Sequence, residues 1–233
     1  MPTTLPPIKR VRWIHAYRIV PSRFPPIGVY DRIADPADLD ALFAIEALTN
    51  PRLREEAGAL KLVAKEHRIS GPGSTPVMAA FTHLNPEGSR FSDGTWGVFY
   101  AARSVATAVE ETVYHREKFL AATAEPACDI EMRCYRTSVD SKLHDIRGGW
   151  PAAHDPDSYI ASVALARELR AADSNGVVYD SARHRGGECL AAFHPDVVAP
   201  CMQAQHLIYR WDGTRIAQVL EVSELKRSKP DRP

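Results

Sequence analysis

The sequence predicts an α+β fold in a single domain. Short runs rich in β-forming residues, turns of Asp-Gly or Gly-Gly type and well-capped helices follow one another without the regular alternation of a βαβ series. The chain has 233 residues, of which 45% are hydrophobic and 25% charged, which is enough for one sizeable core. We expect residues 1–225 to form the domain and residues 226–233 to form a flexible basic tail.

The first expected elements are a strand and a pair of helices. Residues 12–21, RWIHAYRIVP, alternate and are rich in β-formers, which predicts a strand. Residues 35–48 begin with Asp-Pro, a strong helix start, and carry an apolar face. A second helix is expected over 51–69, so that about 35–70 would form an inserted helical pair. The stretch SGPGSTP, 70–76, predicts a loop.

The rest of the chain predicts a mixed set of strands and helices. Ser104 is the expected N-cap of a helix with a buried stripe, and an Asp-Pro pair begins a later one. Asp212-Gly213 predicts the turn of a hairpin. In chain order we expect strands at 77–84 and 96–102, a helix at 105–122, a strand at 128–139, a helix at 155–172, strands at 176–183 and 188–198, and a hairpin over 202–220.

Composition argues against several functional classes. Lys plus Arg and Asp plus Glu are both 29, so the net charge is zero and direct nucleic-acid binding is not expected. No membrane-spanning stretch or signal peptide is evident, which predicts a cytoplasmic protein. No Cys/His cluster has zinc-site spacing, so no metal is expected. The four cysteines form no C-x-x-C pair and are expected to be reduced and mostly buried.

Residues 90–112, RFSDGTWGVFYAARSVATAVEET, combine three kinds of side chain that together suit a nucleotide. Arg90 offers a permanently charged fork for phosphate, Tyr100 a flat ring for a planar base, and Glu111 a carboxylate for a sugar hydroxyl or a developing positive charge. Taken singly, each residue has an ordinary structural explanation. Helical spacing alone does not choose between Glu110 and Glu111, which flank the apolar stripe.

A second stretch, residues 176–193, has the sequence GVVYDSARHRGGECLAAF. An expected strand ends near Ser181 and is followed by a basic loop that contains Arg183 and closes with two glycines. Glycines allow backbone amides to approach an anion, and arginines add positive charge. A charged hairpin loop without a ligand is the alternative.

Together the two stretches resemble the RES domain family, whose members carry a pattern of the type GRFNPPGTPVLYLAESPETALAE followed much later by G-Y-SAR-GG-CLALF. Arg90, Tyr100, Glu111 and Ser181 fall on the functional positions of the family, and the register TALAE against TAVEE selects Glu111 over Glu110. The stretch YRIVPSRF resembles the family's first strand, with Arg18 at its usual arginine. The resemblance covers about 13–219, with Ser-Asp where Asn-Pro is usual.

The resemblance implies a mixed β core similar to that of ADP-ribosyltransferases, flanked by helices, and an enzyme that consumes NAD+ as its substrate. Glu111 would stabilise the oxocarbenium-like transition state when the nicotinamide–ribose bond breaks. Tyr100 would stack on nicotinamide, Arg90 and Arg18 would hold the pyrophosphate or ribose, and Ser181 would bond the nicotinamide end. Arg183 is a further candidate for phosphate.

Many RES proteins are toxins neutralised by an Xre-type helix-turn-helix antitoxin, so such a partner is expected here. The acceptor is left open: water, phosphate, or a side chain of a protein target in an ADP-ribosyltransferase. A non-catalytic module that binds a nucleotide or a partner is an alternative from a different class. A nuclease toxin ranks lower, because the charge is balanced and no cluster of metal-binding carboxylates is evident. The oligomeric state is open as well, with a homodimer as one arrangement.

Overall fold

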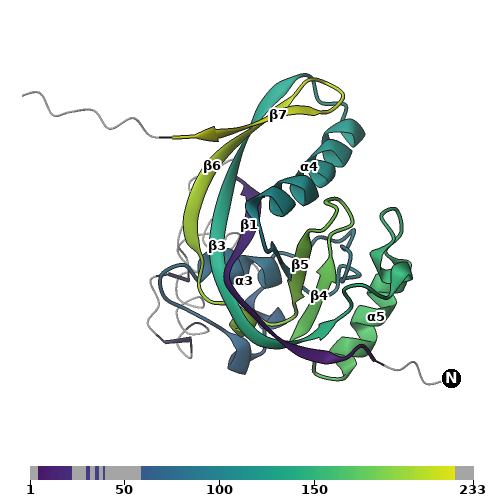
Figure 1. Cartoon of the computed structure of the whole chain (residues 1–233). Helices are drawn as coiled ribbons and strands as arrows, with labels where there is room; N and C mark the ends of the chain where they lie inside the picture. Colours follow the sequence, from purple (N-terminus) through teal and green to yellow (C-terminus); the bar gives the residue numbers. More distant parts are fainter. Residues whose placement is uncertain (1–4, 23–29, 32–34, 37–38, 40–58, 224–233) are drawn as a thin grey trace, which may run out of the picture.

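Seven strands form the framework of the chain, as seen in a computed structural model that describes residues 5–22, 30–31, 35–36, 39 and 59–223 (Figure 1). The strand order is β1-β2-β5-β4-β3-β6-β7, and β1 also pairs with β3. The strands are β1 (Ile8–Pro21), β2 (Phe99–Ala102), β3 (Cys128–Asp145), β4 (Gly176–Asp180), β5 (Glu188–Ala192), β6 (Met202–Trp211) and β7 (Ile216–Val222).

The pairings among the first five strands close on themselves. β1 runs antiparallel to β3 along most of its length and meets β2 through the pair Tyr17 and Ala102. β2 and β4 both pair antiparallel with β5, and β4 pairs parallel with the end of β3. Beyond Tyr17 the strands β1 and β2 part from one another. The mixed pairing confirms the α+β class.

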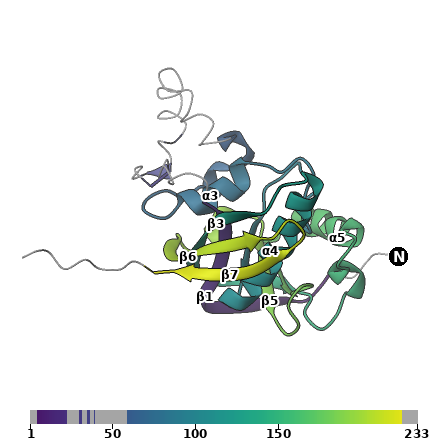
Figure 2. The same ribbon diagram turned by 90° about the horizontal axis from the view of Figure 1, so that it is seen from above.

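Helices cover both faces of this sheet. α3 (Thr75–Thr82) packs on a cluster that includes Phe99 and Leu190. α4 (Val105–Ala122) and α5 (Ile160–Ala171) pack on a second cluster that includes Tyr179 and Cys189. Figure 2, the view from above, separates α3 from α5. Short 3-10 helices are η2 (Leu60–Leu62), η3 (Lys65–His67), η4 (Pro151–His154) and η5 (Pro195–Val197).

Several predicted elements are confirmed. The helix at 105–122 has the expected bounds, because the Ser104 hydroxyl accepts a hydrogen bond from the backbone N–H of Thr107 at 3.1 Å. The strands at 12–21, 96–102, 128–139, 176–183 and 188–198 and the hairpin over 202–220 each correspond to an observed strand or strand pair. Cys134, Cys189 and Cys201 are buried and free, whereas Cys128 is exposed and free.

The strand predicted over 77–84 is wrong, because these residues belong to α3. The helix begins inside the predicted loop, with Ser74 at the N-cap position and Pro76 in its first turn. The helix predicted over 155–172 begins later, at Ile160. The Asp155 carboxylate accepts hydrogen bonds from the backbone N–H groups of Asp157 and Ser158, so this Asp-Pro pair forms a turn before the helix.

The expected helical pair over 35–70 falls mostly outside the described residues. Within the part that is described, residues 60–67 form η2 and η3 instead of a continuous helix. The expected basic tail, 226–233, also lies outside the described residues. In the part of the chain that the structure describes, no helix combines the length and the apolar character that a bilayer span needs.

Candidate active site

The carboxylate of Glu111 and the hydroxyl of Ser181 are joined by a hydrogen bond of 2.6 Å. Glu111 lies on α4 and Ser181 directly follows β4, so the contact links the helix to the end of a buried strand. Of the two adjacent glutamates, Glu110 is exposed, whereas Glu111 is half-buried and makes this contact. Ser181 donates to Glu111, which leaves its oxygen free to accept other hydrogen bonds.

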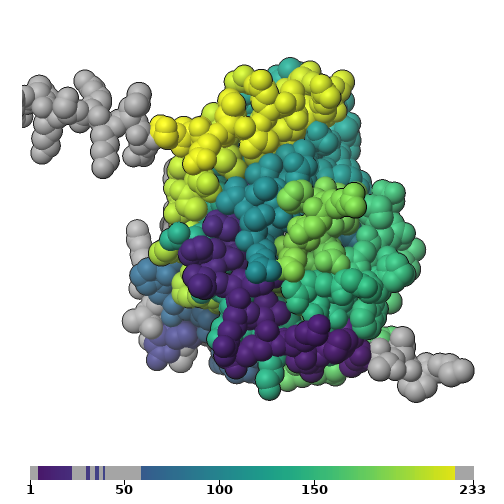
Figure 3. Space-filling model, viewed as in Figure 1, coloured from purple at the N-terminus to yellow at the C-terminus, as the bar shows by residue number. Residues whose placement is uncertain are grey.

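The loop after β4 supplies those donors. The backbone N–H groups of Arg183 and His184 donate to Ser181 Oγ at 3.2 and 2.9 Å. His184 Nδ1 lies 2.9 Å from the Thr107 hydroxyl on the first turn of α4. A Cβ on Gly187 would overlap the Thr107 side chain, so glycine allows this close approach. Figure 3 shows the loop, in light green, beside the teal α4.

Arg183 reaches away from Ser181. Its guanidinium carbon lies 3.3 Å from the centre of the Tyr114 ring, and Nη2 donates to the carbonyl of Pro156. Its Nε has no hydrogen-bond partner among the described residues. The side chain therefore bridges α4 and the segment before α5 by a cation–π contact and a hydrogen bond. The anion-binding role expected for this loop stays a prediction, and the two amides at its start, those of Arg183 and His184, donate to Ser181.

Arg90 is buried, with 6% of its surface exposed. Its Nη1 donates to the carbonyls of Ala153 and Asp155 at 3.1 and 2.8 Å, and its guanidinium lies over the Tyr159 ring at 4.7 Å. These contacts fix the segment between β3 and α5. Tyr159 was not singled out from the sequence, because an aromatic residue in front of a helix has no distinctive spacing.

Tyr100 supports the segment around Arg90. Its hydroxyl lies 2.7 Å from the hydroxyl of Ser89 and accepts a hydrogen bond from the backbone N–H of Phe91 at 2.9 Å. Burial raises the pKa of Tyr100 to about 12, so its hydroxyl stays protonated at neutral pH. The side chain is half-buried, and the hydroxyl is already engaged on both sides of Arg90.

Two buried residues of the sheet connect these groups electrostatically. Tyr179 on β4 lies within electrostatic range of Glu111, Tyr100 and Arg90, and burial raises its pKa. Burial, followed by the Glu111 charge, raises the pKa of the Cys189 thiol on β5. The Arg90 charge opposes both shifts. Glu111 and Arg90 therefore act on the same small region of the sheet, although neither contacts the other directly.

A cavity of about 490 Å³ lies where β1 and β2 part. Among the six predicted site residues, Arg18 and Tyr100 line it, whereas Arg90, Glu111, Ser181 and Arg183 are not among its lining residues. Its other walls come from α3, from the segment around Ser89 and from Arg133 on β3. The volume falls in the range of small-molecule sites. The predicted site thus has two parts: this cavity, and the Glu111–Ser181 pair.

Two arginines that line this cavity each have a buried N–H group without a hydrogen-bond partner among the described residues. Arg18 Nη1 donates to the carbonyl of Tyr100 at 3.2 Å, and the guanidinium lies over the Phe99 ring at 4.9 Å. The buried Nε atoms of Arg18 and Arg133 have no hydrogen-bond partner among the described residues. Burial lowers the pKa of Arg18. Two buried donors at one cavity suit an anionic group such as phosphate.

Arg133 was missed by the sequence analysis. It lies on the predicted strand 128–139, and strand alternation does place it on the same face as Tyr135, another residue that lines the cavity. Alternation alone does not say that this face opens to a cavity. The signal becomes visible only in the pairing of β3 with β1, where Arg133 lies opposite Val20 and Tyr135 lies opposite Arg18, so both arginines reach the same cavity.

Comparison with known proteins identifies relatives of the chain. The family model described as RES domain matches residues 65–212. A Sinorhizobium fredii protein described as "Uncharacterized protein y4oC" is 32% identical over 207 residues, which covers 86% of this chain and 84% of that protein. A chain in the crystal structure of the M. tuberculosis MbcT-MbcA toxin-antitoxin complex is 14% identical, with a TM-score of 0.43, and the match covers 85% of this chain and 86% of that chain.

Proposed function

This chain belongs to the RES domain family, and we propose that it cleaves the nicotinamide–ribose bond of NAD+. The resemblance implies this chemistry. One observation supports Glu111 as the group that stabilises the transition state: the Ser181 hydroxyl donates to its carboxylate at 2.6 Å. A carboxylate held in one orientation before substrate arrives can stabilise positive charge without reorganising during the reaction. This is the property that cleavage through an oxocarbenium-like state requires.

The cavity between β1 and β2 supports the dinucleotide as ligand. Arg18 and Arg133 offer buried donors to the pyrophosphate, and the volume of about 490 Å³ suits a small molecule. Tyr100 lines the same cavity. Tyr179 lies within electrostatic range of both Tyr100 and Glu111.

In the proposed reaction the bond between the ribose C1′ and the nicotinamide nitrogen breaks, and its electron pair stays on the nitrogen. Nicotinamide therefore leaves as a neutral molecule and needs no acid. The Glu111 carboxylate stabilises the positive charge that develops on the ribose more than it stabilises bound NAD+. An acceptor then forms a bond to C1′. Water as acceptor loses a proton and gives ADP-ribose, nicotinamide and one proton.

The test compares two adjacent glutamates. Glu111→Gln keeps an oxygen that accepts from Ser181 but removes the charge, and we expect NAD+ turnover to fall by at least about a hundredfold. Glu110→Gln is the matched control, because Glu110 is exposed on the same helix, and its turnover should stay within about twofold of the unsubstituted chain. Turnover retained by Glu111→Gln would remove Glu111 from this role.

The same assay identifies the acceptor. Mass spectrometry of the products, with and without phosphate and with a cell extract, separates ADP-ribose, its phosphate and a modified protein. NAD+ that binds but remains intact on prolonged incubation would instead support a non-catalytic binding module and contradict the proposed enzyme.

We further propose that the chain is a toxin neutralised by an Xre-type antitoxin, which follows from what the RES resemblance implies. Inducible expression should arrest bacterial growth. If the neighbouring gene encodes a small helix-turn-helix protein, co-expression of that protein should restore growth. The Glu111→Gln variant should be harmless. A variant that is inactive on NAD+ but still toxic would separate toxicity from this chemistry.

A further inference from the structure

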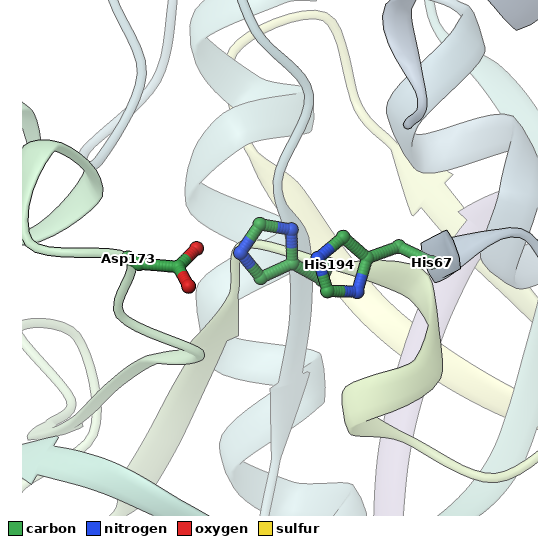
Figure 4. A group of neighbouring side chains, drawn as sticks. All are labelled: His67, Asp173 and His194. Atoms are coloured by element: carbon green, nitrogen blue, oxygen red, sulfur yellow. The ribbon is translucent and has the colours of Figure 1, made fainter. Parts of the chain in front are cut away.

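His67, Asp173 and His194 form a side-chain cluster outside the candidate active site. His67 ends η3, Asp173 follows α5, and His194 precedes η5, so three distant segments contribute one side chain each. One nitrogen or oxygen atom from each lies within 4.8 Å of the others. Figure 4 shows the Asp173 carboxylate facing the His194 ring, with His67 alongside.

The cluster is separate from the Glu111–Ser181 pair. β4 and β5 form an antiparallel hairpin in which Asp180 is paired with Glu188 at one end and Gly176 with Ala192 at the other. Ser181 follows Asp180, whereas His194 follows the Ala192 end. The two sites therefore lie at opposite ends of the same hairpin.

A fourth residue orients one of the imidazoles. Nδ1 of His67 lies 3.0 Å from both carboxylate oxygens of Asp196. A carboxylate accepts but does not donate, so this contact assigns the proton to Nδ1 and leaves the lone pair on Nε2. Metal-binding histidines commonly have such an outer carboxylate, which fixes the tautomer and increases the basicity of the ligand.

The charges around the cluster favour a cation. Two carboxylates, Asp173 and Asp196, accompany the two imidazoles. Arg170 lies within electrostatic range of His194 and opposes this preference. Its guanidinium lies over the rings of Trp96 and Phe193, at 5.1 and 5.9 Å from their centres.

We propose that His67, His194 and Asp173 bind one divalent metal ion of the Zn²⁺ type, with a water molecule as fourth ligand. Two imidazoles and one carboxylate match the ligands of Zn²⁺, whereas Ca²⁺ and Mg²⁺ prefer oxygen atoms throughout. The ion would join η3 to the end of α5 and thereby hold the segment before α3 against the sheet. This proposal departs from the sequence expectation of no metal, because no two of the three ligands are close in the chain.

Binding requires a small rearrangement. Donor atoms around a tetrahedral zinc ion lie about 3.3 Å apart, from bond lengths of about 2.0–2.1 Å. The present separation, up to 4.8 Å, is wider. The two rings are also stacked, with centres 3.9 Å apart and planes 20° from parallel, so one ring must tilt to direct its lone pair at the ion. Asp173 is exposed and can move inward.

The test uses the untagged full chain after dialysis against a chelator. Zn²⁺ titrated by calorimetry should bind with one-to-one stoichiometry. A hundredfold excess over the Kd should raise the thermal unfolding midpoint by about 5–10 °C. Co²⁺ should give the visible absorption of a four-coordinate site. Asp173→Asn, which still suits the left-handed backbone at this position (φ 54°), should weaken Zn²⁺ binding at least about tenfold.

Three further variants complete the test. His194→Ala should abolish the Zn²⁺-induced rise in the unfolding midpoint. Asp196→Asn should weaken binding about tenfold without changing the stoichiometry. His15→Ala, on an exposed histidine of β1, should bind as the unsubstituted chain does. The proposal is overturned if the chain shows no saturable Zn²⁺ binding, or if Asp173→Asn and His194→Ala both bind with unchanged affinity. None of these readouts depends on NAD+ turnover.

Discussion

Replacing Ser181 by alanine should lower NAD+ turnover by about ten- to a hundredfold without unfolding the chain. The lost hydroxyl donates to the Glu111 carboxylate at 2.6 Å. A hydrogen bond to a charged group contributes about 1.5–3 kcal/mol, and each ~1.4 kcal/mol corresponds to a tenfold change in rate. Ser181 is half-buried, so water can partly replace the hydroxyl, and the lower half of this range is the better expectation.

The assay measures initial rates of NAD+ loss together with thermal unfolding. Ser181→Ala should reduce kcat more than it raises KM, because the bond orients a group that acts in the transition state. Ser141→Ala is a matched control, since the Ser141 hydroxyl accepts from Asn175 at 3.1 Å on another part of the sheet. Its turnover should be unchanged. If Ser181→Ala turned over NAD+ at the full rate while Glu111→Gln was inactive, the hydrogen bond would have no part in positioning the carboxylate.

Three other changes test the cavity and its walls. Arg133→Met should raise the KM for NAD+ by about tenfold or more and leave the unfolding midpoint unchanged, because its buried Nε has no partner among the described residues; an unchanged KM would contradict phosphate binding there. Burial raises the pKa of Tyr100 to about 12, so the stability that this shift contributes is complete below pH 10 and is lost as the pH rises to about 12. Tyr100→Phe has no phenol to ionise, so its free energy of unfolding should fall less steeply between about pH 10 and 12 than that of the unsubstituted chain, measured by denaturant unfolding at each pH. Gly97→Ala should destabilise the chain by about 1–3 kcal/mol in denaturant unfolding, because a Cβ there overlaps the backbone of Phe81 on α3, whereas Gly149→Ala has space and should be neutral.

Local signals were sufficient where a single interaction decides the structure. The Ser104 cap fixes the start of α4, and the Asp212-Gly213 pair fixes the turn between β6 and β7. The run at 77–84 failed because a short apolar stretch has no period that separates a helix from a buried strand. Pro76 was the overlooked signal, since proline is common in the first turn of a helix.

The candidate site was predictable only in part. The two sequence motifs are brought together in the fold, because Ser181 of the second motif donates a hydrogen bond to Glu111 of the first. Three contacts seen in the structure could not be predicted from the sequence. Arg90 Nη1 donates to two carbonyls, two loop amides donate to Ser181, and Arg133 lines the same cavity as Arg18. Each depends on pairing between segments that are distant in the chain, which neither periodicity nor local spacing records.

The parting of β1 from β2 gives Arg18 two tasks at once. Strands that separate leave backbone groups in the gap without their usual partners. The Arg18 guanidinium on β1 donates to one of them, the Tyr100 carbonyl on β2, and so links the two strands. Substitutions of Arg18 will therefore disturb both the contact between the two strands and the binding of a ligand in the cavity, so one variant does not separate the two effects. Arg133 carries a free buried donor into the same hollow, so it is the cleaner position from which to alter what enters there.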